Sequence, residues 1–184
     1  MESEGQKLIT AYHGTDENCV NDILNNEFIV KHNKTHWLGN GVYFYLERSL
    51  ASWWANSPTK RFGTGKKNTS PAIIKVEIKC PEEQLLDTRS PSQYDELVEL
   101  YETFIGELMS GGTLINGIDE DELRCSFFDW IVSNYEIDVF IVGFYRKRKD
   151  DDDLRMKFRI YYNEYQLCLF NQSLIVTKER IDVR

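Results

Sequence analysis

Three short segments of the sequence contain residue types that can bind a charged substrate and act on it. In the first, a strand pattern over residues 8–12 gives way to a helix pattern, with His13, Gly14 and Thr15 at the junction. A glycine there lets a ligand approach the backbone closely, and the following helix N-terminus offers unpaired N–H groups to an anion. A histidine in such a place is, by itself, more often a structural residue. The segment therefore indicates a binding site only in combination with others.

The second segment, residues 37–44, places Gly39 and Gly41 directly before a short aromatic strand that contains Tyr43. A helix pattern follows, and it includes Trp54, 11 residues after Tyr43. Two such rings can sandwich a flat cation, which is worth about 0.5–2 kcal/mol. The plain alternative is that Tyr43 is a core residue of its strand. At least one of the two adjacent tryptophans in the helix is expected to lie in the core.

The third segment is a long strand pattern over residues 156–170, and it contains Glu164. Alternation places Glu164 on the same face as Met156, Phe158, Ile160 and Tyr162. A carboxylate on an apolar face is costly unless it is paired, lies at an edge or has a function. Glu164 is therefore either a partner of a nearby Lys or Arg, or a functional group.

Together, the three segments resemble the motifs of the diphtheria-toxin-like branch of the ADP-ribosyltransferases, which includes the poly(ADP-ribose) polymerases. That branch has a His-Tyr-Glu triad on three strands. Its motifs read His-Gly-(Ser/Thr), Gly-x-Gly-(Ile/Val)-Tyr-Phe and, in the polymerases, Tyr-Asn-Glu-Tyr. This chain has them, in that order, at residues 13–15, 39–44 and 162–165. Three motifs in order are far more specific than any one of them. The general layout also resembles small bacterial members of the superfamily.

The resemblance covers roughly residues 8–80 and 136–176, whereas residues 90–135 match no part of the family. It implies an α+β fold with a split antiparallel β-sheet core, flanking helices and a helical insertion at about residues 90–135. We expect residues 1–184 to form one ADP-ribosyltransferase-like domain that contains this insertion.

The resemblance also implies the site residues. The catalytic set would be Glu164, His13 and Tyr43. NAD would be contacted by six residues: His13, Gly14, Thr15, Tyr43, Ser52 and Trp54.

Each of these residues would have a distinct role. His13 would bond the adenosine ribose and Thr15 the other ribose, while the Gly14 backbone, with Ser52, would hold the carboxamide. Tyr43 and Trp54 would sandwich the nicotinamide ring. Glu164 would accept a hydrogen bond from the 2′-OH of the nicotinamide ribose and stabilise positive charge at C1′.

The function implied is that of an enzyme, an NAD-dependent mono-ADP-ribosyltransferase. It would release nicotinamide from NAD, its co-substrate, and transfer ADP-ribose to a macromolecular acceptor, with protein as the favoured class and no metal required. ADP-ribosylation of DNA or RNA, as in a toxin or defence protein, stays open because residues 60–61 and 66–67 are basic. A catalytically silent module that binds NAD or ADP-ribose also stays open. RNA 2′-phosphotransfer is discounted because the first two motifs lack its paired arginines.

The residues before the third motif include a strongly charged segment at residues 145–157. Four consecutive cations at residues 146–149 precede four aspartates at residues 150–153. The superfamily places its target-reading loop here, so we expect this segment to border the acceptor site. The plain alternative is a solvated hairpin whose charges cancel.

The elements that must position these residues follow an α+β order. Strand patterns cover residues 8–12, 41–46, 72–78, 137–144 and 156–170. Helix patterns cover residues 16–28, 46–54, 91–108 and 120–131. Thr15 or Asp16 can cap the first of these helices, Ser90-Pro91 the third, and Asp119 with Glu122 the fourth. We expect the last two helices to be an insertion between strands.

Composition limits the remaining classes. The chain has 184 residues, is 41% hydrophobic and carries a net charge of −8, so long-range attraction to nucleic acid or an anionic membrane is not expected. There is no apolar run of ~18 residues and no signal-like N-terminus, which predicts a cytoplasmic protein. The four cysteines lack CxxC spacing, so we expect free, mostly buried thiols. The three histidines, His13, His32 and His36, predict no structural zinc.

Overall fold

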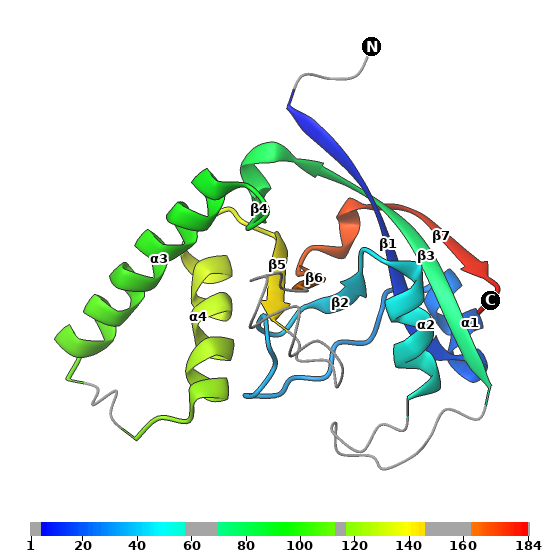
Figure 1. Cartoon of the computed structure of the whole chain (residues 1–184), viewed down its shortest axis with the longest axis horizontal. Coiled ribbons are helices and arrows are strands. Elements are labelled where there is room, and N and C mark those ends of the chain that lie inside the picture. The colour runs from blue at the N-terminus through cyan, green and yellow to red at the C-terminus, as the bar shows by residue number, and fades with distance from the viewer. Residues whose placement is uncertain (1–4, 58–69, 113–116, 146–162, 184) are drawn as a thin grey trace, which may run out of the picture.

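The structure is a computed structural model that describes residues 5–57, 70–112, 117–145 and 163–183 (Figure 1). Its helices are α1 (Glu17–Asn25), α2 (Arg48–Asn56), α3 (Pro91–Ser110) and α4 (Glu120–Asn134). Its strands are β1 (Gln6–Asp16), β2 (Val42–Tyr45), β3 (Pro71–Pro81), β4 (Leu85–Asp87), β5 (Val139–Tyr145), β6 (Asn163–Leu169) and β7 (Ile175–Ile181).

The predicted elements are present, with two additions. The sequence patterns did not predict β4 or β7, and α1 ends before Phe28, which the pattern had included. β6 is described only from Asn163 onward, so the first part of the strand predicted over residues 156–170 lies outside the described residues.

Helix ends follow the predicted capping residues. Asp16 caps α1, where its carboxylate accepts the backbone N–H of Asn18 at 3.0 Å. Asp119 caps α4 and accepts the N–H groups of Asp121 and Glu122. Ser90 precedes Pro91 at the start of α3 but makes no side-chain capping bond, so the proline supplies the start signal there.

The strands form one seven-stranded sheet in the order β4-β5-β6-β2-β1-β3-β7. Every neighbouring pair is antiparallel except β4 and β5, which are parallel. The fold is therefore α+β, as predicted, with a mixed sheet that is antiparallel except at this one edge pair. A parallel neighbour needs a long crossover, and the chain between β4 and β5 supplies one as α3 and α4.

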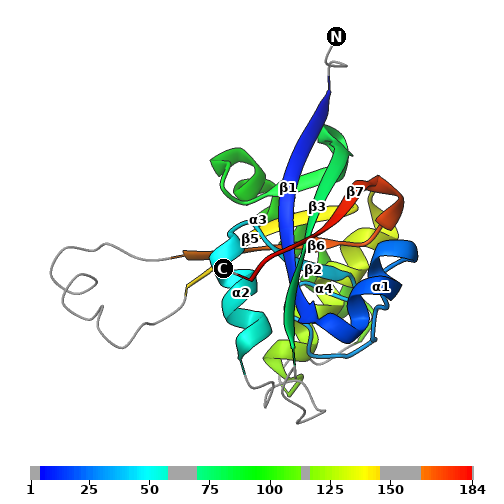
Figure 2. The ribbon, with the colours of Figure 1, turned by 90° about the vertical axis from the view of Figure 1, so that its right-hand side faces the viewer.

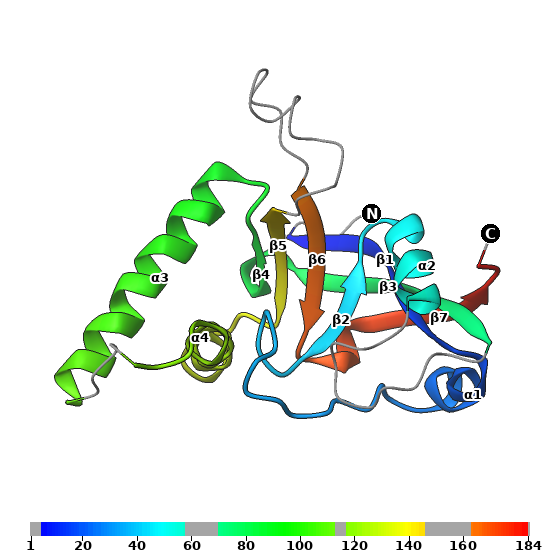
Figure 3. The same ribbon diagram turned by 60° about the horizontal axis from the view of Figure 1, so that its bottom comes forward.

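The sheet consists of two halves that meet at one position. β1 pairs with β3 over its whole length, from Gln6 to Asp16, but with β2 only at Tyr12 and Tyr45. Beyond that position β2 follows β6 instead. As a result, β2, β5 and β6 run across the direction of β1, β3 and β7 (Figure 3).

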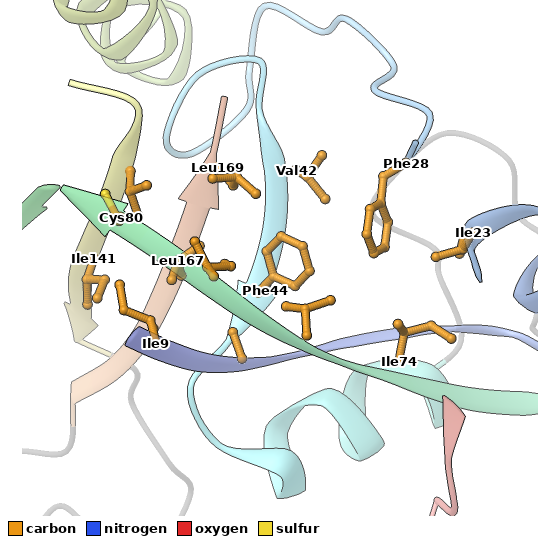
Figure 4. Packing of buried hydrophobic residues seen from close by; sticks show 14 of the residues in the cluster. Ile9, Ile23, Phe28, Val42, Phe44, Ile74, Cys80, Ile141, Leu167 and Leu169 are labelled. Carbon is orange, nitrogen blue, oxygen red and sulfur yellow. The ribbon is translucent and has the colours of Figure 1, made fainter. Parts of the chain in front are cut away.

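Apolar side chains fill the space on both faces of the divided sheet. On the α1 side, Phe44 of β2 packs with Phe28, Ile74 and Leu167 (Figure 4). On the other side, α2 packs on β1 and β3, so that α1 and α2 lie on opposite sides of these strands (Figure 2). α3 and α4 cover β5 and β6 with a separate cluster that includes Phe104, Phe128 and Phe140. The helices thus hold the two halves of the sheet in place.

A buried carboxylate fastens the end of β4. Asp87 accepts two side-chain hydrogen bonds from Arg89, at 2.8 and 2.6 Å, and lies 3.6 Å from the ammonium of Lys7 on β1. Burial alone would raise the pKa of Asp87, but the hydrogen bonds and charge of Arg89 outweigh it and keep the pKa below its ordinary value. The charged form of Asp87 therefore stabilises the fold.

We predict that Asp87→Asn lowers the free energy of unfolding by about 1.5–3 kcal/mol at neutral pH, because the hydrogen bonds to a charged acceptor are weakened. The pKa of Asp87 is lower in the folded state, so its stabilisation is present above the unfolded pKa and is lost as pH falls through the folded pKa. Urea unfolding at pH 7 and at progressively lower pH should show the two proteins converging in acid. Asp182→Asn, which alters an exposed carboxylate, is the control and should have no measurable effect; an equal loss in the control would remove the special role of Asp87.

Candidate functional site

The three motif strands are neighbours in the sheet. β2 lies between β1 and β6, and the paired positions Tyr12, Tyr45 and Gln166 form one row across the three strands. Strands distant in sequence thus become neighbours. In this register Tyr43 is paired with Cys168, four residues after Glu164, and the His13 ring packs with Phe28 and Phe44 on the face opposite to Tyr43. This arrangement defines the candidate site.

His13 bridges the divergence. Its Nδ1 donates to the backbone carbonyl of Tyr43 at 2.8 Å, and since a carbonyl only accepts, Nδ1 carries the proton. Burial lowers the pKa of His13, and the bond to Tyr43 offsets only part of that effect. The edges of the Phe28 and Phe44 rings surround the imidazole. His13 is therefore neutral, with Nε2 as its acceptor nitrogen.

Gly14 is required by helix packing. A Cβ at this position would overlap the carbonyl oxygen of Ala51 and lie 3.0 Å from the backbone nitrogen of Ala55, both on α2. The sequence suggested that a ligand approaches this glycine, whereas on its side-chain face α2 occupies the space. Thr15 follows on β1, in register with Ala72 of β3.

Tyr43 holds the loop before its own strand. Its hydroxyl accepts the backbone N–H of Leu38 at 2.7 Å and donates to the carbonyl of Gly39 at 2.9 Å. Gly39 adopts a φ of 77°, which favours glycine. Burial raises the pKa of Tyr43 far above its ordinary value, so the phenol stays protonated and keeps both bonds.

Within the described residues, the aromatic side chains of α2 do not form the direct pair with Tyr43 that the predicted sandwich of Tyr43 and Trp54 would have suggested. The Trp54 ring contacts Tyr45, with 6.4 Å between centroids, and Trp53 is the more exposed tryptophan. Tyr43 lies on the same face of β2 as Tyr45, but no direct ring contact joins Tyr43 and Trp54 in the part of the chain described. The Ser52 hydroxyl donates to the carbonyl of Val183 at 2.9 Å.

Glu164 is buried at the start of β6. Only 4% of the residue is exposed, and Oε1 accepts a hydrogen bond from the side-chain amide of Gln166 at 3.1 Å. Gln166 is paired with Tyr45, so alternation places Glu164 on the face of the sheet that also carries Tyr43 and Tyr45. The sequence left Glu164 either as the partner of a Lys or Arg or as a functional group; the structure shows that it is buried. Tyr162 and residues 146–157 of the predicted target-reading segment lie outside the described residues.

Sequence reasoning did not find a contact between the inserted helix α4 and the loop before Tyr43. Asp129 accepts the backbone N–H of Asn40 at 2.7 Å and its side-chain amide at 2.6 Å. Arg124 donates to the carbonyl of Trp37 at 3.2 Å and lies over its ring. These residues are 87 to 89 positions apart in the chain, and no periodic pattern signals such a pairing.

The same loop also reaches the strand next to Glu164. The Trp37 ring packs on Phe144, with 4.8 Å between centroids, and Phe144 is the residue of β5 paired with Glu164. The insertion is therefore connected, through one loop, to both Tyr43 and the neighbour of Glu164.

The described residues contain no group of three His, Cys, Asp or Glu side chains placed to hold a metal ion. No helix in these ranges is long and apolar enough to cross a membrane. All four cysteines are free, with Cys80, Cys125 and Cys168 buried and Cys19 exposed, as predicted.

Comparison with known proteins finds a relative over nearly the whole chain. The chain is 27% identical to the uncharacterized protein MJ0359 of Methanocaldococcus jannaschii, and the alignment covers 95% of this chain and 88% of that protein. No protein-family model matches the chain, and no solved structure matches it significantly. At this coverage the alignment includes most of the two-helix insertion.

We predict opposite effects for two glycine substitutions. Gly14→Ala should lower the free energy of unfolding by about 1–3 kcal/mol, because α2 must move off β1. Gly106→Ala, in the middle of α3 with nothing near its Cβ position, should raise it by about 0.5–1 kcal/mol through helix propensity. Thermal and urea unfolding of both variants would test this. A harmless Gly14→Ala would show that α2 is not packed against β1 at this point.

Proposed function

We propose that this protein is an NAD-dependent ADP-ribosyltransferase, which cleaves nicotinamide from NAD and transfers ADP-ribose to a macromolecular acceptor. The observation that carries the proposal is the adjacency of β1, β2 and β6, which makes the strands of His13, Tyr43 and the buried Glu164 neighbours in the sheet. We further propose that this divided sheet is the split sheet of the ADP-ribosyltransferase fold, with α3 and α4 as an insertion.

The position of Glu164 suits the chemistry of nicotinamide release. Breaking the bond between C1′ and the nicotinamide nitrogen develops positive charge on the ribose, and a carboxylate in a water-poor site stabilises that charge strongly. Gln166 orients one carboxylate oxygen by its hydrogen bond. The carboxylate would accept a hydrogen bond from the ribose 2′-OH.

The state of His13 suits a hydroxyl ligand. Because Nδ1–H is committed to Tyr43, Nε2 would accept a hydrogen bond from the adenosine ribose. Thr15 would contact the other ribose. The backbone of Gly14 and the hydroxyl of Ser52 would hold the carboxamide; for Ser52 this requires the bond to Val183 to open or be shared.

The aromatic residues would form the nicotinamide slot. Tyr43 and Trp54 lie on the same side of the sheet with the buried Tyr45 between them, so a nicotinamide ring held by both would require Tyr45 to move aside. Aromatic faces attract the cationic ring by about 0.5–2 kcal/mol. Protein is the favoured acceptor, and a nucleic acid acceptor or a silent NAD-binding module are the alternatives that experiment must exclude.

We predict that Glu164→Gln reduces nicotinamide release by about 10²–10³-fold without unfolding the protein, since the change is nearly isosteric and removes only the charge. Release of nicotinamide from NAD by the purified proteins would measure it. Glu179→Gln makes the same chemical change at an exposed position of β7 and should leave the rate unchanged. A folded Glu164→Gln variant with full activity would contradict the proposal, and a wild type that binds NAD but releases nothing would favour the silent module.

The acceptor class can be tested separately with labelled NAD and a cell lysate. The label should become attached to material that protease digests and nuclease does not. Loss of the label after nuclease treatment would instead identify a nucleic acid acceptor.

We predict that Asp129→Ala raises the KM for NAD by about tenfold, which corresponds to 1.4 kcal/mol, with a smaller change in kcat. The reason is that Asp129 acts as a positioning residue: without it the loop of residues 37–41 loses its anchor while Glu164 is untouched. Steady-state kinetics would measure both constants. Asp129→Asn, which keeps an oxygen acceptor for the Asn40 N–H, should recover part of the loss.

The matched control is Ser133→Ala on the same helix, where the hydroxyl donates to the Asp129 carbonyl and not to the site loop. It should change neither constant. If Asp129→Ala lowers stability but leaves KM unchanged, the contact is structural only.

A further inference from the structure

Helix α3 has more apolar surface than the body of the protein covers. Leu100 and Phe104 are buried, and Leu97 and Leu108 pack beside them on the cluster shared with α4. A second set of apolar side chains lies exposed along the same helix; we call this set the α3 stripe. It consists of Tyr94, Val98, Tyr101 and Met109, which are 55%, 41%, 44% and 64% exposed.

The spacing places these side chains in one line. Val98, Tyr101 and Met109 lie 4, 7 and 15 residues after Tyr94. At 100° per residue, the four side chains point within an arc of about 80° around the helix. The half-buried Ile105 lies within the same arc. α3 lies at the edge of the molecule with α4 on its inner side (Figures 1 and 3). A continuous exposed stripe on one helix face is the form taken by helix-in-groove and helix–helix docking surfaces.

The charge around the stripe selects the partner. α3 itself carries five acidic residues and no basic one. Residues 91–134 hold ten acidic residues and one arginine, while the rest of the chain holds 21 basic and 20 acidic residues. The acidic excess of the whole chain therefore resides on this insertion. Asp95, Glu99 and Glu102 follow the stripe along one side in the helical projection.

A hollow beside the stripe offers a place for an apolar anchor. A pocket of about 230 Å³ lies between α3 and α4, with Phe104, Leu108, Gly111 and Trp130 among its lining residues. A Leu or Met side chain of a partner helix would fit a hollow of this size. The hollow, which Glu107 also lines, flanks the stripe on one side, and the acidic rim of Asp95, Glu99 and Glu102 flanks it on the other. A cationic amphipathic helix would lay its apolar face over the stripe and hollow and its charges along the rim.

We propose that the α3 stripe is the docking surface for a cationic amphipathic helix of a partner protein. Its apolar face would cover the four stripe residues, and its Lys or Arg residues would meet the acidic rim. A second copy of this chain is disfavoured as the occupant, because two such helices would bring five acidic residues each to one interface. This proposal does not depend on the proposed transferase activity.

The experiment uses the full chain and a labelled helical peptide about five turns long, with Leu on one face and Lys on the other. Fluorescence anisotropy should show binding that weakens as salt increases, because part of the attraction is electrostatic. Val98→Gln combined with Met109→Gln should weaken binding by at least about tenfold. Glutamine keeps the helix propensity of α3, so circular dichroism of this variant should match wild type.

The matched control replaces two exposed apolar residues elsewhere, Leu8→Gln with Ile29→Gln, which are 61% and 82% exposed. It should bind the peptide as wild type does. Equal binding of a peptide with the same composition in scrambled order would overturn the proposal, since charge alone would then explain the attraction. So would unchanged affinity of the stripe variant, or a wild-type dimer that the stripe variant abolishes. Nicotinamide release should be the same for wild type and the stripe variant, so failure here is distinguishable from failure of the proposed function.

Discussion

The single pairing of β1 with β2, at Tyr12 and Tyr45, is the constraint on which the candidate site depends. Where two strands separate, backbone groups on the facing edges lose their regular ladder partners and need others. The imidazole of His13 supplies one by donating Nδ1–H to the Tyr43 carbonyl. The bond holds the divergence at a defined width, and it also determines which nitrogen of His13 stays free to accept. Structural and chemical demands on this histidine therefore coincide.

The same requirement explains the loop of residues 37–41, whose backbone groups would otherwise lack partners. The Tyr43 hydroxyl takes the Leu38 N–H and the Gly39 carbonyl, and Asp129 takes the Asn40 N–H. The first two bonds come from the motif itself and the third from the insertion. A loop held from both sides can keep the Trp37 ring in place on Phe144, the neighbour of Glu164.

The sequence predicts features that depend on residues close together in the chain better than contacts between distant segments. Caps such as Asp16 and Asp119 act within three residues, so these were predictable. Strand alternation gave the face of Glu164 but not its burial, which depends on the strands and helices packed around it. The Asp129–Asn40 pair and the parallel β4–β5 pairing join distant segments and have no local pattern. The adjacent tryptophans are an intermediate case. Helix periodicity requires Trp53 and Trp54 to point in different directions. Only the contact with Tyr45 shows that Trp54 is the one that packs against the sheet.

The proposed substrate is anionic, whereas residues 91–134 hold ten acidic residues and one arginine. The position of these charges relative to the candidate site therefore matters. The charged side chains of α4 that contact the site loop are already matched with partners: Arg124 pairs with Asp121 and lies over Trp37, and Asp129 accepts both bonds from Asn40. The acidic residues of α3 lie along an exposed helix, where salt screens them beyond about 8–10 Å. The rest of the chain is nearly neutral in sum. Half of the ten acidic residues of this segment lie on α3, away from the site loop, and the other half lie on α4 or its N-cap. The two helices thus have different roles: α4 anchors the site loop, and α3 presents an exposed charged face.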